Sequence, residues 1–375
     1  MKRRYKIFKH LTLTIEGVVN ALFILAFAIA LLAPYISPKI TVLPAFFNLS
    51  YPVWFFLLLL FFLFYLLRRR WLLFGIYSVL LLFAIPYSLA YCPVRFGTNK
   101  APQDAEVIKV MTYNVKSFKG KSKNGETAIK FINNSDADIV CLQEAIFNSN
   151  LEKNTALLKK SFGKEYPYIH EHVDYESHSQ GLVLLSKYPI IKQIPIRYPA
   201  DGNSSCSYML KHRDGEKIMV VNNHMESYRL TQRDKQTIKG WIKKEPLLNI
   251  PRIYSGLREK LGPKLETRAF AAGVVKQTVD SLSLLYTPAY SFVCGDMNDT
   301  PMSYTYKTMR SDMRDAYKDA GSGFGFTYNE RFFWFRIDHI FYSGNLKAYL
   351  SKVENKEGIS DHNPLVAEFY VIPID

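Results

Sequence analysis

The sequence predicts an α/β sandwich with mixed β-sheets, preceded by an N-terminal membrane region of three helices. Three long apolar segments lie within the first 92 residues of the 375-residue chain. The remainder alternates short strand-like runs with amphipathic runs, and some strands follow one another through tight turns, as at residues 213–216. Interleaved helices combined with strand-to-strand turns favour mixed sheets over a purely parallel sheet.

The apolar segments are expected to cross a membrane at about residues 11–33, 50–67 and 71–91. A spanning helix needs about 20 apolar residues, with roughly 17 as the lower limit. A buried core hairpin is one alternative. A cleaved signal peptide is another, but it explains the basic start and one apolar run without explaining the other two. We therefore expect a membrane anchor at 1–92, a linker at 93–105 and a catalytic domain at 106–375.

Charge predicts the orientation of this anchor. Residues 1–100 carry a net charge of +10 and the rest of the chain only +5, so the basic excess does not indicate nucleic-acid binding. Basic residues in short loops stay in the cytoplasm, which places the N-terminus and Arg68, Arg69 and Arg70 inside. Three spans then place the catalytic domain outside the cytoplasm, in an integral protein of the cell or inner membrane. Two spans would leave it in the cytoplasm.

Short runs rich in β-branched and aromatic residues predict eight strands in the remaining chain. They cover residues 107–115, 137–143, 181–186, 205–211, 217–223, 291–295, 336–342 and 364–371. Helices are predicted at residues 126–133, 151–162, 231–244, 264–285 and 303–310. Cys141 and Cys294 lie inside apolar strands and are expected to be buried. Cys92 and Cys206 are expected to be more exposed, with a disulfide between them as one alternative.

Polar residues collect where the predicted strands end. The segments that carry them contain Asn114, Glu144, Asn222 with His224, Asp296 with Asn298, Asp338, and Asp361 with His362. Each segment alone is a weak signal, because a histidine or carboxylate at a strand end is most often structural. Ligands bind beyond the strand ends of such sheets, so the shared placement predicts one site.

These residue types suit phosphoester hydrolysis. Glu144, with Asp361 or Asn114, offers the oxygen ligands that Mg²⁺ or Mn²⁺ prefers. Asp296 is a candidate base for an attacking water, with Asn298 beside it. His362, paired with Asp338, is expected to stabilise charge on the phosphoryl oxygens. His224 is a second imidazole able to contact phosphate or to protonate the leaving oxygen.

The motifs MTYNV, CLQE, GLVLLSKYPI, VNNHMES, CGDMNDTP, RIDHIF and SDHNPL occur in this order. Together they resemble the endonuclease/exonuclease/phosphatase superfamily, with its deoxyribonuclease-I-like fold, and indicate a membrane-anchored, bacterial-type member. The resemblance covers about residues 106–373 and implies a four-layer α/β sandwich and Mg²⁺-dependent phosphoester cleavage. It matches Asn114 and Glu144 to the metal site, and Asn222 and His224 to the N-x-H motif, which makes Asn222 a candidate for binding substrate. Asp296 and Asn298 match the water-activating pair, and Asp338, Asp361 and His362 match the terminal motifs.

Two positions refine this expectation. Members of the superfamily that cut at abasic DNA sites carry an aspartate where this chain has Lys116, which disfavours a DNA-repair role. Arg268 is a candidate for binding substrate phosphate, although a surface or structural role is the commoner one for such a helix residue. The run Phe332, Phe333, Trp334 and Phe335 could stack a base or enter lipid, with a buried strand slightly favoured.

The expected function is therefore a membrane-anchored, divalent-metal-dependent phosphoesterase that acts on a nucleic acid, a phospholipid or a sugar phosphate. Nuclease is one alternative, and a phosphodiesterase or phosphatase of the sphingomyelin or inositol-phosphate type is another. A non-catalytic membrane scaffold with the same fold is a third. The absence of a glycine-rich phosphate loop predicts that no nucleotide cofactor is used.

Overall fold

The computed structural model describes residues 2–95, 97, 100–118, 125–148, 150–173, 181–199, 202–228, 236, 250–330, 333–355 and 359–373. The chain forms two compact units. The first comprises Met1–Ser88 with Met302–Tyr304, and the second comprises Leu89–Pro301 with Thr305–Asp375.

The first unit is built from apolar helices. They are α1 (Lys2–Leu32), α2 (Leu43–Leu49), α3 (Tyr51–Leu67) and α4 (Trp71–Tyr91). Within α1 the segment Leu13–Leu32, and α4 as a whole, are long and apolar enough to cross a membrane. The pair α2 and α3, bent by 72°, would make a third span if it crosses as one. Two to three spans are thus available, and the predicted orientation stays a prediction.

A polar cluster joins three of these helices. The Asn20 side chain on α1 is buried, donates to the Tyr65 hydroxyl on α3 at 2.6 Å and accepts from the Tyr77 hydroxyl on α4 at 2.6 Å. A buried amide needs such partners, and polar groups of this kind hold apolar helices in register.

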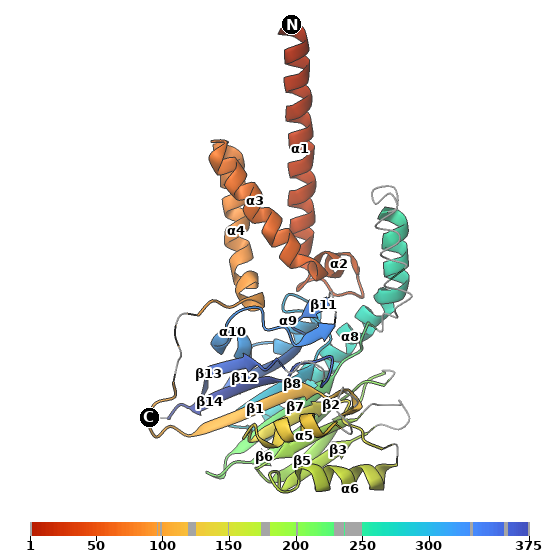
Figure 1. Cartoon of the computed structure of the whole chain (residues 1–375), viewed down its shortest axis with the longest axis vertical. Coiled ribbons are helices and arrows are strands. Elements are labelled where there is room, and N and C mark those ends of the chain that lie inside the picture. The colour runs from red at the N-terminus through yellow and green to blue at the C-terminus, as the bar shows by residue number, and fades with distance from the viewer. Residues whose placement is uncertain are drawn as a thin grey trace. The chain divides into compact units, whose positions relative to one another are not determined.

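The second unit contains two six-stranded mixed sheets (Figure 1). In spatial order, the first sheet consists of β13 (Leu346–Val353), β14 (Leu365–Val371), β1 (Val107–Asn114), β2 (Ile139–Gln143), β4 (Leu182–Ser186) and β3 (Tyr168–His172). The second consists of β5 (Ile190–Ile196), β6 (Ser204–Lys211), β7 (Lys217–His224), β8 (Tyr290–Asp296), β12 (Asp338–Gly344) and β9 (Arg314–Asp315). β1 with β2 and β7 with β8 are parallel, and the other pairs are antiparallel.

The helices and a small hairpin complete the unit. They are the 3₁₀ turn Lys116–Phe118, α5 (Glu126–Asn133), α6 (Leu151–Phe162), α8 (Ile250–Tyr286), α9 (Tyr304–Arg310), α10 (Ala316–Ala320), β10 (Tyr328–Glu330) and β11 (Phe333–Phe335).

Side-chain alternation along the strands produces four layers. On β1, Val110 points into the core between the two sheets, whereas Met111 packs toward α5 and α6. The outer face of the second sheet packs against α8 and α9 through residues such as Ala272 and Met309. Successive strand residues face opposite sides of the sheet. The sequence of a strand that is covered on both faces is therefore an almost continuous apolar run. The predicted four-layer sandwich of two mixed sheets is confirmed.

Each of the eight predicted strands is present, and α5 and α6 have the predicted bounds. The predicted helix at residues 231–244 lies outside the described residues apart from position 236. Strands β3, β5 and β13 were not predicted, because polar or charged residues break their apolar pattern.

The cysteine expectation is wrong at one position. Cys206 is fully buried in β6, within the core between the sheets, and not exposed. All four cysteines are free, so the Cys92–Cys206 disulfide does not form in this structure. Cys206, Tyr208 and Leu210 lie on the face of β6 that packs into the core between the two sheets.

Candidate active site

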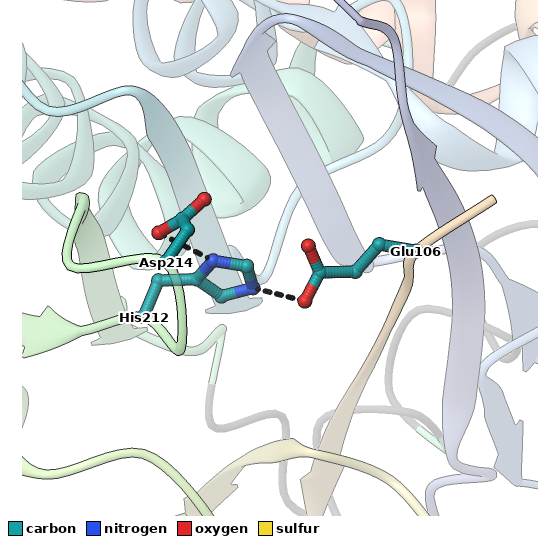
Figure 2. Close-up of side chains that lie close together, drawn as sticks. All are labelled: Glu106, His212 and Asp214. Atoms are coloured by element: carbon teal, nitrogen blue, oxygen red, sulfur yellow. Dashed lines mark ion pairs between the residues drawn. The ribbon is translucent and has the colours of Figure 1, made fainter.

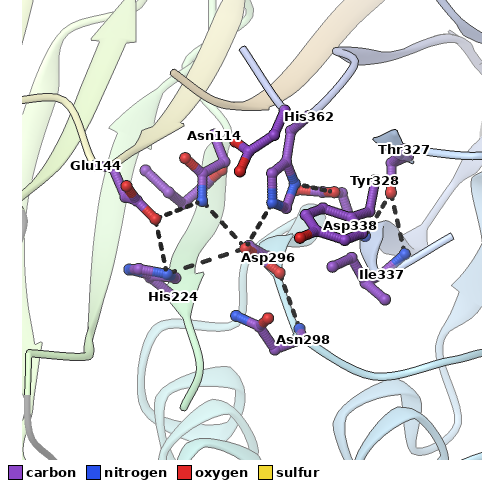
Figure 3. A network of polar contacts seen from close by, with 12 residues as sticks. Asn114, Glu144, His224, Asp296, Asn298, Thr327, Tyr328, Ile337, Asp338 and His362 are labelled. Carbon is purple, nitrogen blue, oxygen red and sulfur yellow. Dashed lines mark hydrogen bonds and ion pairs between the residues drawn. The ribbon is translucent and has the colours of Figure 1, made fainter. Parts of the chain in front are cut away.

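Strand pairing brings three of the predicted residues side by side. In the parallel pair of β7 and β8, His224 is the register partner of Asp296. In the antiparallel pair of β8 and β12, Asp296 is also the register partner of Asp338. Asn114 ends β1 in the other sheet, and Glu144 directly follows β2. The strand ends of both sheets therefore contribute to one polar cluster (Figure 3).

Asp296 occupies the centre of this cluster and is 1% exposed. Its Oδ2 accepts a hydrogen bond from Asn114 Nδ2 at 3.1 Å, and its Oδ1 accepts one from the Asn298 backbone N–H at 2.9 Å. The Nε2 atoms of His362 and His224 lie 3.6 and 3.9 Å from Oδ2. Those two distances are too long for hydrogen bonds, so among the described residues both imidazole nitrogens face the space beside the carboxylate without donating to it.

Glu144 lies across from Asp296. Its Oε1 accepts from Asn114 Nδ2 at 3.1 Å and is 3.7 Å from His224 Nε2. Burial raises the pKa of Glu144, and the charge of Asp361 raises it further, against the lowering effect of Asn114 and His362. A desolvated carboxylate near a second carboxylate is the environment that a bound cation would relieve.

His362 is held between two carboxylates. Its Nδ1 lies 2.8 Å from Asp338 Oδ2, and the Tyr328 ring packs edge-on at 5.2 Å between centroids. Burial by itself would lower the pKa of His362, but Asp338 and Asp296 outweigh it and raise the pKa to about 10. The ring is therefore an imidazolium at neutral pH, with both nitrogens as donors.

The pKa values of Asp296 and His224 are shifted mainly by burial. Burial raises the pKa of Asp296 to about 6, with Asp338 adding to the rise and His362 and His224 opposing it. Burial lowers the pKa of His224, although Asp296 partly compensates. Asp296 is thus a carboxylate whose pKa lies close to neutral pH, and His224 is a neutral imidazole there.

The backbone around this cluster adopts rarely populated conformations. Glu144 and Asn298 have positive φ angles of 52° and 50°, and Lys116, Ser117 and Phe118 form a run with φ of 45°, 52° and 54°. Such conformations cost about 1–3 kcal/mol each for residues with a side chain and persist where the surroundings enforce them. The Asn298 side chain is fixed in turn by its bond to the Met225 carbonyl at 2.9 Å.

The glycine of the CGDMN motif, Gly295, is required for a steric reason. Gly295 has φ of +134°, and a Cβ atom there would lie 2.0 Å from the Asn223 carbonyl oxygen. A side chain is therefore excluded directly before Asp296. The close approach of β7 and β8 at this point aligns His224 with Asp296.

Asp361 lies at the edge of the cluster. Its Oδ2 forms an ion pair with Lys116 Nζ at 2.6 Å, and its backbone carbonyl accepts from Asn329 N at 2.8 Å. Lys116 is the residue that departs from the abasic-site pattern, and its direct contact with Asp361 was not foreseen. Thr327 was also missed. Its Oγ1 accepts from the backbone N–H groups of Ile337 and Asp338, both at 3.0 Å.

Asn222 is placed apart from this network. Its amide donates to the carbonyl oxygens of Leu142 and Val183, and its Oδ1 accepts from Gln143 Nε2 at 2.7 Å. The side chain is fully buried and ties the two sheets together. These contacts give no support to the predicted role of Asn222 in substrate binding.

Arg268 is fully buried, so of the roles left open for it a surface position is excluded, whereas a structural role and phosphate binding both stay open. Its guanidinium lies 4.2 Å from the centroid of the Tyr228 ring, and its Nε is 3.9 Å from Asp299 Oδ2. None of its nitrogens has a hydrogen-bond partner among the described residues. A buried guanidinium with five donors and only a loose carboxylate contact is suited to receive an anionic ligand.

Two groups of described residues could hold a metal ion by proximity alone. Asp296, Asp338 and His362 form one, but there the imidazole itself neutralises both carboxylates. Glu106, His212 and Asp214 form the other, at the opposite end of β7 from His224. Its two carboxylates lie on opposite sides of the ring, at 3.2 and 2.8 Å from different nitrogens (Figure 2). That arrangement links the start of β1 to the β6–β7 turn and does not surround a cation.

The oxygen atoms suited to a metal belong instead to Glu144, Asp361 and Asn114. Carboxylate and amide oxygens are the ligands that Mg²⁺ and Mn²⁺ prefer. In this structure the Asn114 amide nitrogen faces Glu144 and Asp296, and its Oδ1 accepts from the Lys116 backbone N–H. This donor set fits a hard divalent cation.

Comparison with known families decides the identity of the fold. The model of the Endonuclease/Exonuclease/phosphatase family matches residues 111–362. The chain belongs to this family. The family's name and fold support hydrolysis of phosphoesters, which is the coarse function that the cluster described above suits. A domain family of unknown function matches residues 11–91.

Solved structures with the same fold come from distant relatives. Truncated Caenorhabditis elegans TDP2 superposes with a TM-score of 0.51 at 19% identity, over 71% of this chain and 98% of that one. A second structure of C. elegans TDP2 gives 0.51 at 20% identity, over 72% and 77%. The human Nocturnin catalytic domain with bound sulfate gives 0.48 at 17% identity, over 71% and 95%. Identities this low show the fold alone. No curated protein matches the sequence.

Proposed function

We propose that this protein is a membrane-anchored, divalent-metal-dependent phosphoesterase, in which Asp296 activates water and His362 stabilises the phosphoryl group. The observation that carries the proposal is the meeting of Asn114, Glu144, His224, Asp296 and His362 around one space, although they come from distant parts of the chain. A structural polar network would satisfy every donor, whereas here both Nε2 atoms face the shared space.

Glu144, Asn114 and Asp361 are the proposed metal ligands. A Mg²⁺ or Mn²⁺ ion held by them would neutralise phosphate charge and polarise the scissile P–O bond. The raised pKa of Glu144 supports this assignment, because burial and the charge of Asp361 disfavour the ionised carboxylate and a bound cation would favour it. Lys116 already neutralises Asp361 in part, so the cation and this ammonium group are expected to compete for the same carboxylate.

Asp296 is the proposed general base. The backbone N–H of Asn298 holds Oδ1, which leaves Oδ2 directed at the shared space with Asn114 on one side. A pKa of about 6 lets Asp296 remain ionised at neutral pH and still accept a proton from water. Asp338 orients the His362 imidazolium, and its Nε2–H is then available for a phosphoryl oxygen.

His224 and Arg268 are proposed to contact the substrate. His224 is a neutral imidazole that can donate from Nε2 to a phosphate oxygen or to the leaving group. Arg268 would bind a non-bridging oxygen with its buried guanidinium. For Asn222, the role in substrate binding rests on the motif alone.

The anchor is proposed to cross the membrane three times, with the catalytic domain at 106–375 outside the cytoplasm. Support comes from the two to three apolar helices and the basic N-terminus. A reporter fused after residue 375 that is active only outside the cytoplasm would test this. Activity of a reporter that works only in the cytoplasm would overturn the three-span topology.

Hydrolysis is tested with the full-length protein in detergent or nanodiscs. The substrate panel comprises a generic phosphodiester, single- and double-stranded nucleic acids, phospholipids and sugar phosphates, each with Mg²⁺ or Mn²⁺. We expect hydrolysis of at least one class, loss with EDTA, and a loss of about 10²–10⁴-fold in Asp296→Ala. The matched control is Asp280→Ala, which removes an exposed carboxylate on α8. Activity that survives Asp296→Ala would contradict the mechanism, and a folded, inactive wild type across the panel would favour the scaffold alternative.

A further inference from the structure

An open groove of about 720 Å³ lies beside the candidate active site. Phe326, Trp334, Leu350, Arg95 and Lys352 are among the residues that line it. Trp334 is 54% exposed and Phe326 is 37% exposed. Phe324, which is 50% exposed, stacks on Phe326 with 5.3 Å between ring centroids. We call Phe324, Phe326, Trp334 and Leu350, with Arg95 and Lys352, the aromatic groove.

The exposure of Trp334 overturns the slight preference for a buried strand. Phe332 lies outside the described residues, so the outcome concerns Trp334 and Phe335 only. Large aromatic side chains gain about 1.5–3 kcal/mol each when removed from water. Several aromatic side chains that are exposed close together, with cationic side chains beside them, indicate an interaction surface.

Hydrogen bonds to two backbone carbonyls hold this region next to the end of α4. The Ala90 carbonyl accepts from Arg336 Nη2 at 2.6 Å, and Arg336 is itself buried against Asp315 at 3.0 Å. The Pro93 carbonyl accepts from Gly323 N at 3.0 Å, directly before Phe324.

These contacts limit how far the aromatic groove lies from the membrane-spanning segment. Tyr91 is the last residue of α4, and Pro93 follows two residues later. Two residues reach at most about 7 Å, so Gly323 lies within about 10 Å of the end of α4 in any direction that the helix takes. The headgroup layer on one side of a bilayer is about 5–8 Å thick. The side chains of Phe324 and Phe326 can span the remaining distance.

We propose that the aromatic groove docks on the headgroup layer of the bilayer that α4 crosses. Tryptophan and other aromatic residues are enriched at this layer. Arg95 has no ion-pair partner among the described residues and suits lipid phosphates, whereas Lys352 pairs with Glu354 at 3.0 Å. A surface for single-stranded nucleic acid would combine stacked aromatics with a track of cations, and of the two cations named for the described part of the groove, Lys352 is paired with Glu354.

Docking would have a consequence for substrate choice, which rests on the function proposed above. The groove and the catalytic cluster share a wall, because Asn329 lines the groove and its N–H donates to the Asp361 carbonyl. Asn363 also lines the groove, directly after His362. A docked groove would therefore place the cluster beside lipid headgroups and favour phosphate esters at the membrane surface.

The test uses tryptophan fluorescence of the full-length protein in vesicles of phosphatidylcholine and phosphatidylglycerol. Lipids brominated high on the acyl chain quench only tryptophans at that depth. The readout is the difference between the wild type and Trp334→Phe, a mild change that isolates Trp334 from the other three tryptophans. We expect the Trp334 signal to fall at least twofold with brominated lipid and to be little affected by aqueous iodide.

A matched control moves the reporter to the far edge of the first sheet. Tyr168→Trp, made in the Trp334→Phe background, lies on β3 at the opposite edge from β13 and is 38% exposed in the native residue. It should respond to iodide and not to brominated lipid.

Two outcomes would overturn the proposal. One is a Trp334 signal that iodide quenches and brominated lipid does not. The other is a signal that changes only on addition of a single-stranded oligonucleotide, which would assign the groove to nucleic acid. The same measurement on Asp296→Ala does not depend on hydrolysis, so a failure of docking is distinguished from a failure of the proposed catalysis.

Discussion

The Lys116 ammonium group lies 2.6 Å from Oδ2 of Asp361. Lys116 stands two residues after Asn114, and its backbone N–H donates to the Asn114 Oδ1 at 3.1 Å. The lysine therefore touches two of the three proposed metal ligands at once, from a backbone conformation with φ of 45°. A positive charge built into the chain is thus placed at the position where the abasic-site pattern described above has an aspartate.

Replacing Lys116 by Gln should tighten the binding of a divalent cation. The ion pair is half-exposed, so it is worth up to about 1 kcal/mol, and its removal should lower the Kd for Mn²⁺ by about fivefold. Isothermal titration calorimetry of the full-length protein in detergent measures this directly. Lys347→Gln, at an exposed position of β13, serves as the control. Unchanged or weaker Mn²⁺ binding in Lys116→Gln would contradict competition at Asp361.

Replacing Asp338 by Asn should lower kcat far more than it changes KM. The substitution keeps the shape of the side chain but removes the carboxylate that accepts from His362 Nδ1 at 2.8 Å. Loss of the orienting carboxylate in a His–Asp pair costs up to ~10⁴-fold in other hydrolases, and a decrease of about 10²–10⁴-fold is expected here. Steady-state kinetics on the best substrate of the panel, with the melting temperature as a folding check, measures it. A folded Asp338→Asn variant with wild-type kcat would remove His362 from the mechanism.

Replacing Arg268 by Lys should weaken substrate binding. Lysine keeps the charge but loses the planar set of donors that a buried guanidinium offers to phosphate. We expect KM to rise about tenfold, which corresponds to roughly 1.4 kcal/mol of binding free energy. Arg258→Lys, at an exposed position on the same helix, is the matched control. Equal KM values in the two variants would leave Arg268 with a structural role only.

Replacing Gly295 by Ala should destabilise the second unit. The new Cβ would meet the Asn223 carbonyl oxygen at 2.0 Å with a φ of +134°, so β7 and β8 would have to separate at the site. A loss of more than about 2 kcal/mol in the free energy of unfolding is expected, visible as a lower melting temperature. Gly273→Ala on α8 has open space around its Cβ and should be neutral or slightly stabilising. A Gly295→Ala variant as stable as Gly273→Ala would contradict the steric argument.

The buried pair of Asp315 and Arg336 should stabilise the protein at neutral pH and lose this effect in acid. Burial by itself would raise the pKa of Asp315, but Arg336 and His339 lower it below its usual value. The unfolded chain then binds more protons near pH 4, so the stabilisation is fully present above about pH 4 and is lost as pH falls through the folded-state pKa. Asp315→Asn removes it and leaves Arg336 buried without its carboxylate, at a cost of about 3–5 kcal/mol.

Melting temperatures of the wild type and Asp315→Asn across pH 3–8 check this expectation, a range of roughly one pH unit below to four above the unfolded pKa. The gap between the two should be widest near neutral pH and narrow in acid. A gap that is constant over the whole range would show that Asp315 contributes through packing and not through its charge. Asp312→Asn, at an exposed carboxylate nearby in the chain, should match the wild type throughout.

Local sequence patterns were enough to predict several helices, the polar residues at strand ends and the apolar N-terminal helices. The helices at residues 126–133 and 151–162 were predicted with their observed bounds, because amphipathic spacing and flanking turn residues are properties of neighbours in the chain. The polar residues at strand ends were recognisable for the same reason, since each interrupts an apolar run. Two to three apolar helices likewise follow from composition and length.

The sequence by itself therefore determined the apolar N-terminal helices, eight strands of the sandwich with the helices at residues 126–133 and 151–162, and the residue types available for chemistry. Only the tertiary structure decided that His224, Asp296 and Asp338 are register partners, that Arg268 and Cys206 are buried, and that Trp334 is exposed. The physical reason is that strand register and burial depend on groups tens to hundreds of residues away, whereas hydrophobic periodicity is set by residues within one or two turns of the chain.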